Sequence, residues 1–259
     1  MGERVYSGVI ATALGIIKAM DWPVTVIGAE NIPPAGPAIV ASNHVGYMDF
    51  VFSGYAARER GRRVRFLAKK EIFDKKGVGW LMRQMGHIPV DRFGTPDASV
   101  RAAVDALRAG EIIGMFPEAT ISPSFVPRRG KTGTVRAARE TGAPIIPVAV
   151  WGTQRIMTKW RPRNLKRGIP IVVNVGSPLA RVEGEDVEAE TARLMERITE
   201  LLAQAQATYP AQPASDDDRW WLPAHLGGTA PTLEDAEQRL DEEREQKRAR
   251  REEKRARGR

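Results

Sequence analysis

The feature that most constrains the fold is a series of short, apolar, β-branched runs separated by helical patterns. Near-continuous apolar runs of this length are typical of strands buried on both faces. The runs cover residues 24–28, 38–42, 64–68, 112–116, 145–151 and 171–176. The helical patterns cover residues 49–60, 76–86, 97–109, 131–142 and 184–208. This alternation predicts an α/β fold with a mainly parallel sheet flanked by helices.

The composition excludes several kinds of chemistry. The chain of 259 residues has no cysteine and only three histidines, His44, His87 and His225. Disulfides, thiolate metal sites and cysteine nucleophiles are therefore excluded, and we expect no metal site.

The positive charge lies in the first part of the chain. Residues 1–212 hold 29 Lys and Arg against 20 Asp and Glu, whereas residues 213–259 are nearly balanced, with 11 against 12. A basic body indicates an anionic partner, either nucleic acid, a phosphorylated metabolite or an anionic membrane surface. No nucleic-acid-binding motif occurs in the sequence, so we expect no specific nucleic acid.

The two ends are predicted to differ from the 23–209 domain between them. Residues 1–22 contain an uncharged run of thirteen residues that ends at Ile17, shorter than the roughly 20 residues that span a bilayer. We expect an interfacial membrane-binding helix here, with Tyr6 and Trp22 at the headgroups, and the alternative is a helix packed on the domain. Residues 210–259 read as a linker and a highly charged tail that is disordered or a solvated helix. The paired Trp220 and Trp221 within it are expected to pack on the body or to meet the membrane.

His44 stands between the 38–42 strand and the helical pattern that begins near Asp49. Ligands of open α/β sheets bind beyond the carboxyl ends of such strands. A carboxylate that holds one imidazole nitrogen leaves the other free to act as a base. Because no G-x-S-x-G nucleophile elbow occurs in the chain, the nucleophile can be a hydroxyl of the substrate.

Two further stretches carry polar residues that suit a ligand. Glu118 and Thr120 follow the 112–116 strand and a proline. The 69–92 stretch carries Lys70 and Arg92, and cations on loops near such a site are suited to phosphate.

Together these stretches resemble the glycerolipid acyltransferases, specifically the 1-acylglycerol-3-phosphate O-acyltransferase family. The first motif stands as 43-NHVGYMD-49, and the second as 70-KEI-72, 79-GW-80 and 86-GHIPVDR-92. The third stands as 116-FPEATIS-122 with a later 131-KTG-133, and the fourth as 143-APIIPVAVWG-152. The four motifs occur in order over residues 24–180.

This resemblance implies acyl transfer from acyl-CoA or acyl-carrier protein to the sn-2 hydroxyl of 1-acylglycerol-3-phosphate, giving phosphatidic acid. It implies His44 as general base and Asp49 as the residue that orients it. Acyl-CoA would be a donor substrate, and no further cofactor is implied. The enzyme would work at the cytoplasmic side of the cell membrane as a peripheral or monotopic protein. The substrate-binding residues that it implies are Asn43, Lys70, Arg92, Glu118, Thr120 and Lys131.

The third motif departs from the family at two positions. Ala119 replaces a glycine, and Ile121 replaces the arginine usually assigned to the acceptor phosphate. Either the nearby 128-RRGK-131 supplies the cation, or the acceptor is another lysophospholipid or a glycolipid. A non-catalytic, membrane-associated lipid-binding protein is a further alternative.

Overall fold

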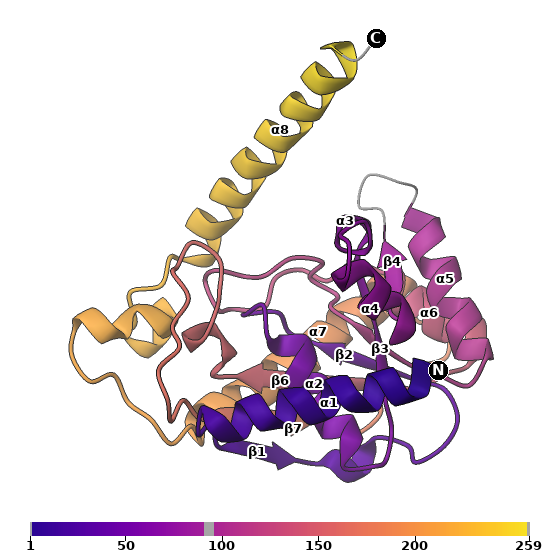
Figure 1. Cartoon of the computed structure of the whole chain (residues 1–259), viewed down its shortest axis with the longest axis horizontal. Coiled ribbons are helices and arrows are strands. Elements are labelled where there is room, and N and C mark those ends of the chain that lie inside the picture. The colour runs from indigo at the N-terminus through magenta and orange to yellow at the C-terminus, as the bar shows by residue number, and fades with distance from the viewer. Residues whose placement is uncertain (1, 91–95, 258–259) are drawn as a thin grey trace.

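The centre of the molecule is one seven-stranded sheet in the order β1-β7-β6-β2-β5-β3-β4. The computed structural model describes residues 2–90 and 96–257 (Figure 1). The strands are β1 (Val24–Ile27), β2 (Ala38–Ser42), β3 (Val64–Lys69), β4 (Ile88–Val90), β5 (Ile112–Met115), β6 (Ile145–Trp151) and β7 (Ile171–Val175). The strands from β6 to β4 are parallel, whereas β7 is antiparallel to β6 and β1 is parallel to β7. The predicted α/β class with a mainly parallel sheet is confirmed.

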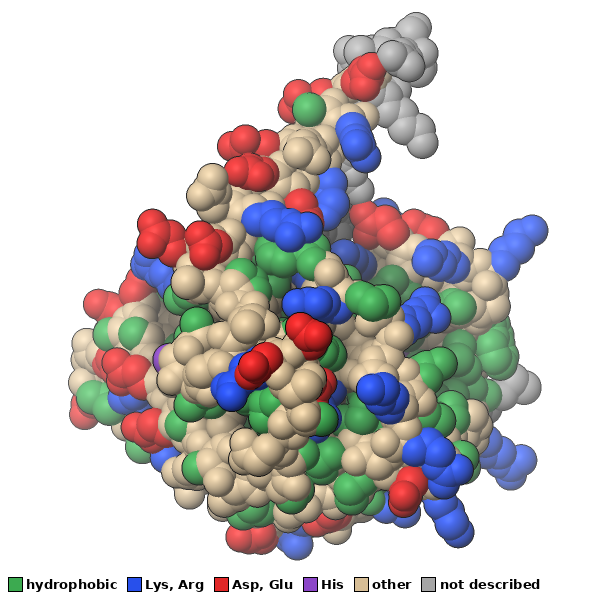
Figure 2. Space-filling model, turned by 90° about the vertical axis from the view of Figure 1, so that its left-hand side faces the viewer, with side chains coloured by type: hydrophobic (Ala, Val, Ile, Leu, Met, Phe, Trp, Pro, Cys, Tyr) green, Lys and Arg blue, Asp and Glu red, His purple; other side chains and the backbone are tan. Residues whose placement is uncertain are grey.

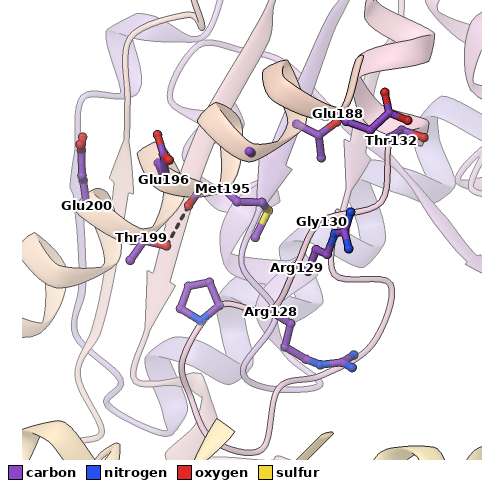
Figure 3. A pocket seen from close by; sticks show the side chains of 12 residues that line it. Arg128, Arg129, Gly130, Thr132, Glu188, Met195, Glu196, Thr199 and Glu200 are labelled. Carbon is purple, nitrogen blue, oxygen red and sulfur yellow. Dashed lines mark hydrogen bonds between the residues drawn. The ribbon is translucent and has the colours of Figure 1, made fainter. Parts of the chain in front are cut away.

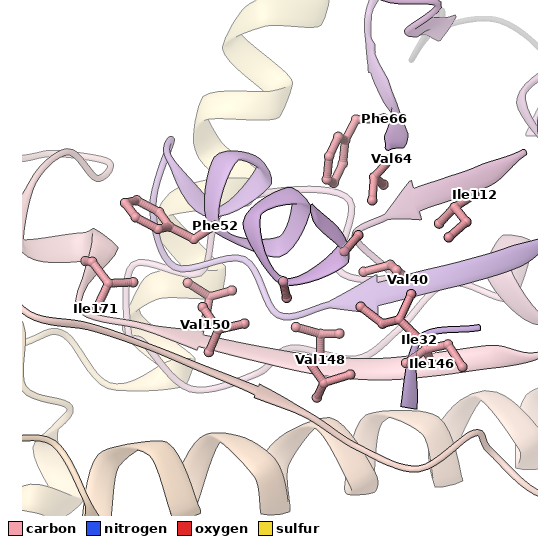
Figure 4. Close-up of a cluster of buried hydrophobic side chains, with 14 of the residues drawn as sticks. Ile32, Val40, Phe52, Val64, Phe66, Ile112, Ile146, Val148, Val150 and Ile171 are labelled. Carbon is pink, nitrogen blue, oxygen red and sulfur yellow. The ribbon is translucent and has the colours of Figure 1, made fainter. Parts of the chain in front are cut away.

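Helices cover both faces of the sheet. The α-helices of the described residues are α1 (Gly2–Ala19), α2 (Asp49–Arg58), α3 (Lys70–Phe73), α4 (Val78–Gln84), α5 (Pro96–Arg108), α6 (Gly133–Thr141), α7 (Val187–Ala207) and α8 (Leu233–Arg257). Helix α2 packs on one face through Phe52 and Ala56, in the cluster that Figure 4 shows. Helices α5, α6 and α7 pack on the other face through residues such as Leu107, Val135 and Leu194. The central strands are buried on both faces, which is why their sequences are apolar without alternation.

The sequence pattern missed strand β4 and the short helix α3. Strand β4 is only three residues long, contains Pro89 and lies at the edge of the sheet. Too few residues are present to form a pattern, and a proline is tolerated at a sheet edge. The predicted 76–86 helix is the shorter α4, and α3 precedes it as a separate turn.

Helix α1 lies against the body, and the two aromatic residues expected at lipid headgroups point inward. The Tyr6 hydroxyl donates to the Val64 carbonyl over 2.6 Å, and the Trp22 side chain is buried, with its Nε1 donating to the Lys166 carbonyl. The headgroup-anchor interpretation of these two residues is therefore wrong, because the body offers acceptors that satisfy their polar atoms. Within residues 2–90 and 96–257, every helix falls short of the length and hydrophobicity that a membrane-spanning segment needs.

The segment after α7 packs on the body before α8 leaves it. Trp221 is 1% exposed and lies in a cluster with Trp151 and Tyr209. The first turns of α8 bury Ala236 and Leu240, and the helix then extends away from the body (Figure 1). The paired tryptophans were expected to pack on the body or to meet the membrane, and Trp221 packs on the body.

We predict that Trp221→Ala destabilises the whole domain. Removal of a buried tryptophan costs about 3–5 kcal/mol in unfolding free energy, because a cavity remains. Trp220→Ala is the matched control, since Trp220 is only half-buried and should cost less than about 1 kcal/mol. Chemical denaturation of both variants measures the difference. Equal, small losses would show that residues 210–232 do not form part of the cooperative unit.

Candidate active site

The carboxyl ends of three neighbouring strands bring the candidate residues together. Strand β2 pairs with β5 on one side and with β6 on the other, all in parallel. His44 follows β2, Glu118 follows β5 and Thr153 follows β6. Because parallel strands end at the same edge, these three side chains come from separate parts of the chain to one place.

His44 and Asp49 form the predicted pair. The Nδ1 atom of His44 lies 2.9 Å from Oδ2 of Asp49, which is the first residue of α2. The Asp49 side chain is fully buried, while 16% of the His44 side chain is exposed. The carboxylate therefore holds Nδ1 and leaves Nε2 available to a bound molecule.

Asp49 is also fixed by the backbone and by a residue that the sequence analysis missed. The N–H groups of Val45 and Gly46 donate to Oδ2 over 2.7 and 2.8 Å, and the Thr153 hydroxyl donates to Oδ1. The sequence could have indicated Thr153 as it indicated His44, since both residues follow the carboxyl end of an apolar strand, where ligands of open α/β sheets bind. A carboxylate with this many donors is held in one orientation.

Phe116 is a second residue that the sequence reasoning did not single out. Its ring stacks on the His44 imidazole with 4.2 Å between the ring centroids. The stack covers one face of the imidazole and, with the bond to Asp49, restricts rotation of the ring.

Glu118 is placed differently from the prediction that it contacts the acceptor. Its side chain is 3% exposed, and its two oxygens accept the backbone N–H groups of His44 (2.8 Å) and Arg128 (3.0 Å). Burial raises the pKa of Glu118 to about 8, against the lowering effect of these two N–H groups. Glu118 thus joins the His44 turn to the loop that carries Arg128, and it fixes the backbone of His44.

Asn43 also forms its side-chain hydrogen bonds within the protein. Its side chain is buried and exchanges two hydrogen bonds with the backbone of Val150, at 3.0 and 2.7 Å. Asn43 continues the pairing of β2 with β6 past the last strand residue. Both groups of its amide are bonded to the backbone, and the expected substrate contact stays a prediction.

Three other predicted substrate-binding residues, Thr120, Lys131 and Lys70, lie around the same edge. Thr120 is half-buried in the turn after Glu118, and Lys131 is exposed, with its backbone N–H donating to the Pro117 carbonyl over 2.9 Å. Lys70 is exposed at the carboxyl end of β3. Arg92 lies outside the described residues.

The two departures in the third motif have clear structural consequences. Ala119 has a φ of 58°, in the left-handed region that favours the family's glycine. Ile121 is 3% exposed, so this position faces the interior. A cation for an anionic acceptor must therefore come from another position.

Arg128 is engaged by the C-terminal helix. Its Nε lies 3.3 Å from Oε1 of Glu237 on α8, and only 12% of its side chain is exposed. A cavity of about 670 Å³ lies beside the same loop, between residues 127–132 and α7 (Figure 3). Arg129, Glu196 and Glu200 line it, but His44 does not, so we place the chemistry at the His44 edge.

The described ranges contain no group of three or more His, Cys, Asp or Glu side chains that could hold a metal ion. The fold and the site define an α/β protein in which a histidine–aspartate pair stands at the carboxyl edge of a mainly parallel sheet.

Comparisons with known proteins agree with this class. The family model described as Acyltransferase matches residues 23–151. The 1-acyl-sn-glycerol-3-phosphate acyltransferase of Bacillus subtilis is 29% identical over 197 residues, which cover 74% of this chain and 94% of that protein. The chloroplastic LPAT1 of Arabidopsis thaliana, with the same activity in its name, is 30% identical over 52% of this chain and 38% of that protein.

A solved structure supports the fold. The crystal structure of the acyltransferase PlsC from Thermotoga maritima matches with a TM-score of 0.67 and 24% identity, over 81% of this chain and 83% of that chain. The chain belongs to the acyltransferase family, and it is an enzyme that transfers acyl groups.

We predict that Glu118→Gln destabilises the fold and lowers activity. Glutamine places an NH₂ group where one carboxylate oxygen accepts a backbone N–H, and an unsatisfied buried donor costs about 1–3 kcal/mol. Thermal unfolding and acyl-transfer rates measure the two effects. Glu190→Gln is the matched control: Glu190 is buried too, but it pairs with Arg139 away from His44. It should lower stability and leave the turnover of the folded enzyme unchanged.

The same variant tests the raised pKa. Because the pKa of Glu118 is about 8 in the folded state and its ordinary value is 4.5, the folded state binds more protons between these values. The free energy of unfolding should therefore fall as pH rises from about 4.5 to 8. Glu118→Gln should flatten this slope. A variant with the stability and pH dependence of the wild type would contradict the role given to Glu118.

Proposed function

We propose that the chain transfers a fatty acyl group from acyl-CoA or acyl-carrier protein to the sn-2 hydroxyl of 1-acylglycerol-3-phosphate, giving phosphatidic acid. The relatives in Bacillus subtilis and Arabidopsis thaliana are named 1-acyl-sn-glycerol-3-phosphate acyltransferases, which supports this acceptor. The observation that carries the proposal is the contact of His44 with the buried Asp49 at the carboxyl edge of the sheet.

In this mechanism His44 acts as general base. Its Nε2 takes the proton of the acceptor hydroxyl as the hydroxyl oxygen attacks the thioester carbonyl, and Asp49 stabilises the imidazolium that forms. The tetrahedral intermediate then collapses, the carbon–sulfur bond breaks, and the donor's thiolate takes the proton from His44. The acyl group passes directly to the acceptor, without an acyl-enzyme.

Lys131 is the cation that we propose for the acceptor phosphate. The hydrogen bond from its backbone to Pro117 holds it beside the turn that contains Glu118, and its side chain is exposed. Arg128 is less suited, because only 12% of its side chain is exposed. Thr120, half-buried in the same turn, would position the acceptor's glycerol.

A second candidate function is acylation of another lysophospholipid or of a glycolipid hydroxyl. The observation in its favour is Ile121, an interior residue where the family has its phosphate-binding arginine. In both cases the acceptor comes from a bilayer, so we propose peripheral attachment to the cytoplasmic side of the cell membrane.

We predict that His44→Ala lowers acyl transfer by about 10²–10⁴-fold, since that is the usual effect of removing a general base. The assay follows labelled acyl-CoA with 1-acylglycerol-3-phosphate, other lysophospholipids and a lysoglycolipid as acceptors. His225→Ala is the matched control, because His225 is exposed and lies in the segment before α8. Near-normal turnover by a folded His44→Ala protein would contradict the mechanism. Preference for an acceptor without a phosphate monoester would favour the second function.

A further inference from the structure

We propose that the loop of residues 159–168, which we call the basic loop, docks the enzyme on an anionic bilayer. This inference rests on the proposed function, because it assigns the surface through which that site reaches its lipid. The loop reads 159-KWRPRNLKRG-168 and has five Lys and Arg but no acidic residue. Leu165 is 69% exposed, more than any other large hydrophobic side chain in the part of the chain that the structure describes.

The loop is held in place by hydrogen bonds, so the exposure of Leu165 is a fixed feature. The Lys166 carbonyl accepts from Trp22 Nε1 over 3.0 Å, and the Gly168 N–H donates to the Met20 carbonyl over 3.0 Å. The Asn164 N–H donates to the Ile156 carbonyl, and the Asn164 side chain accepts the N–H of Lys166. These bonds tie both sides of Leu165 to the body while its side chain remains in solvent.

The cations that flank Leu165 are available to an external anion. Lys159 pairs with Glu243, and Arg161 lies over the Trp220 ring. Arg163, Lys166 and Arg167 are exposed, and no ion pair with an acidic side chain involves them within residues 2–90 and 96–257. Leu165 thus stands next to unneutralised positive charge.

The basic loop lies on the same edge of the sheet as His44. It follows the carboxyl end of β6 and precedes the antiparallel β7, so it stands beyond the ends of β2 and β6. The N–H of Tyr47, three residues after His44, donates to the Met157 carbonyl over 2.9 Å. Tyr47 is 46% exposed, and Ile16 near the end of α1 is 50% exposed.

Figure 2 views the molecule from this side. Lys and Arg side chains lie over the right half of this face, from the middle to the bottom, next to hydrophobic ones. A bilayer placed against this face would lie parallel to the edge where His44 stands, and the acceptor would not have to cross the protein to reach it.

The chemistry favours a bilayer. An exposed leucine can enter the boundary between headgroups and acyl chains, and neighbouring cations then meet anionic headgroups. Each Lys or Arg near an anionic surface raises binding about fivefold. An acidic carrier protein would also attract the cations, and the experiments separate it from the bilayer.

The first experiment is flotation with phosphatidylcholine vesicles, with and without phosphatidylglycerol. Leu165→Asp should lower the partition coefficient about tenfold, as loss of a half-buried leucine predicts. Joint replacement of Arg163, Lys166 and Arg167 by Ala should lower it about 100-fold on anionic vesicles and little on neutral ones. The matched controls are Val182→Asp and Arg181→Ala. Val182 is 49% exposed and Arg181 is exposed too, but they lie near the amino end of β6, at the opposite edge.

The second experiment separates docking from catalysis. With a short-chain lysolipid dispersed in solution, the loop variants should keep wild-type activity; with vesicle-embedded acceptor, their activity should fall in parallel with binding. Flotation equal to the wild type would overturn the proposal. If the loop variants float normally and lose activity only when acyl-carrier protein is the donor, the proposal is also overturned. The basic loop would then be a binding site for the carrier protein. If the wild type transfers no acyl group to any acceptor, the proposed function is refuted. The flotation experiment would still test membrane docking independently.

Discussion

The site depends on the buried carboxylate of Asp49. A carboxylate without water around it is costly unless donors surround it, and here four of them do. They are the His44 imidazole, the N–H groups of Val45 and Gly46, and the Thr153 hydroxyl. Because these donors come from the β2–α2 turn and from the residues after β6, the carboxylate joins two neighbouring strand ends and fixes the ring of His44 at once.

Glu118 makes the corresponding connection at the end of the third strand, β5. Its two oxygens hold the backbone of His44 and the backbone of Arg128, which lies in the next loop. The two acids that the sequence marks as functional are therefore mostly engaged by the protein itself. Asp49 orients the imidazole, Glu118 fixes the backbone that carries it, and the exposed side of His44 remains for substrates. Helix α8 joins this arrangement from the far end of the chain through Glu237 and Arg128.

The sequence predicted most of the sheet and the His44–Asp49 pair. Both depend on local signals, since a doubly buried strand is apolar throughout and the two residues are five positions apart. The pattern could not predict β4, because three edge residues with a proline carry no periodicity. It placed Tyr6 and Trp22 at a membrane because their partners, Val64 and Lys166, are far away in the sequence. The pattern also could not predict the hydrogen bond of Asn43 to Val150 or the ion pair of Arg128 with Glu237, because both join residues that are far apart in the sequence.

The central claim is that neutral His44 keeps its proton on Nδ1 and offers the lone pair of Nε2. Nitrogen NMR of the histidine-labelled protein at neutral pH measures this tautomer directly, with His44→Ala assigning the signal. His87 provides an internal reference, because its Nδ1 accepts the Phe66 N–H over 3.0 Å and burial lowers its pKa to about 4. We expect opposite tautomers, with the proton on Nδ1 in His44 and on Nε2 in His87. A neutral His44 that carries its proton on Nε2 would contradict the account.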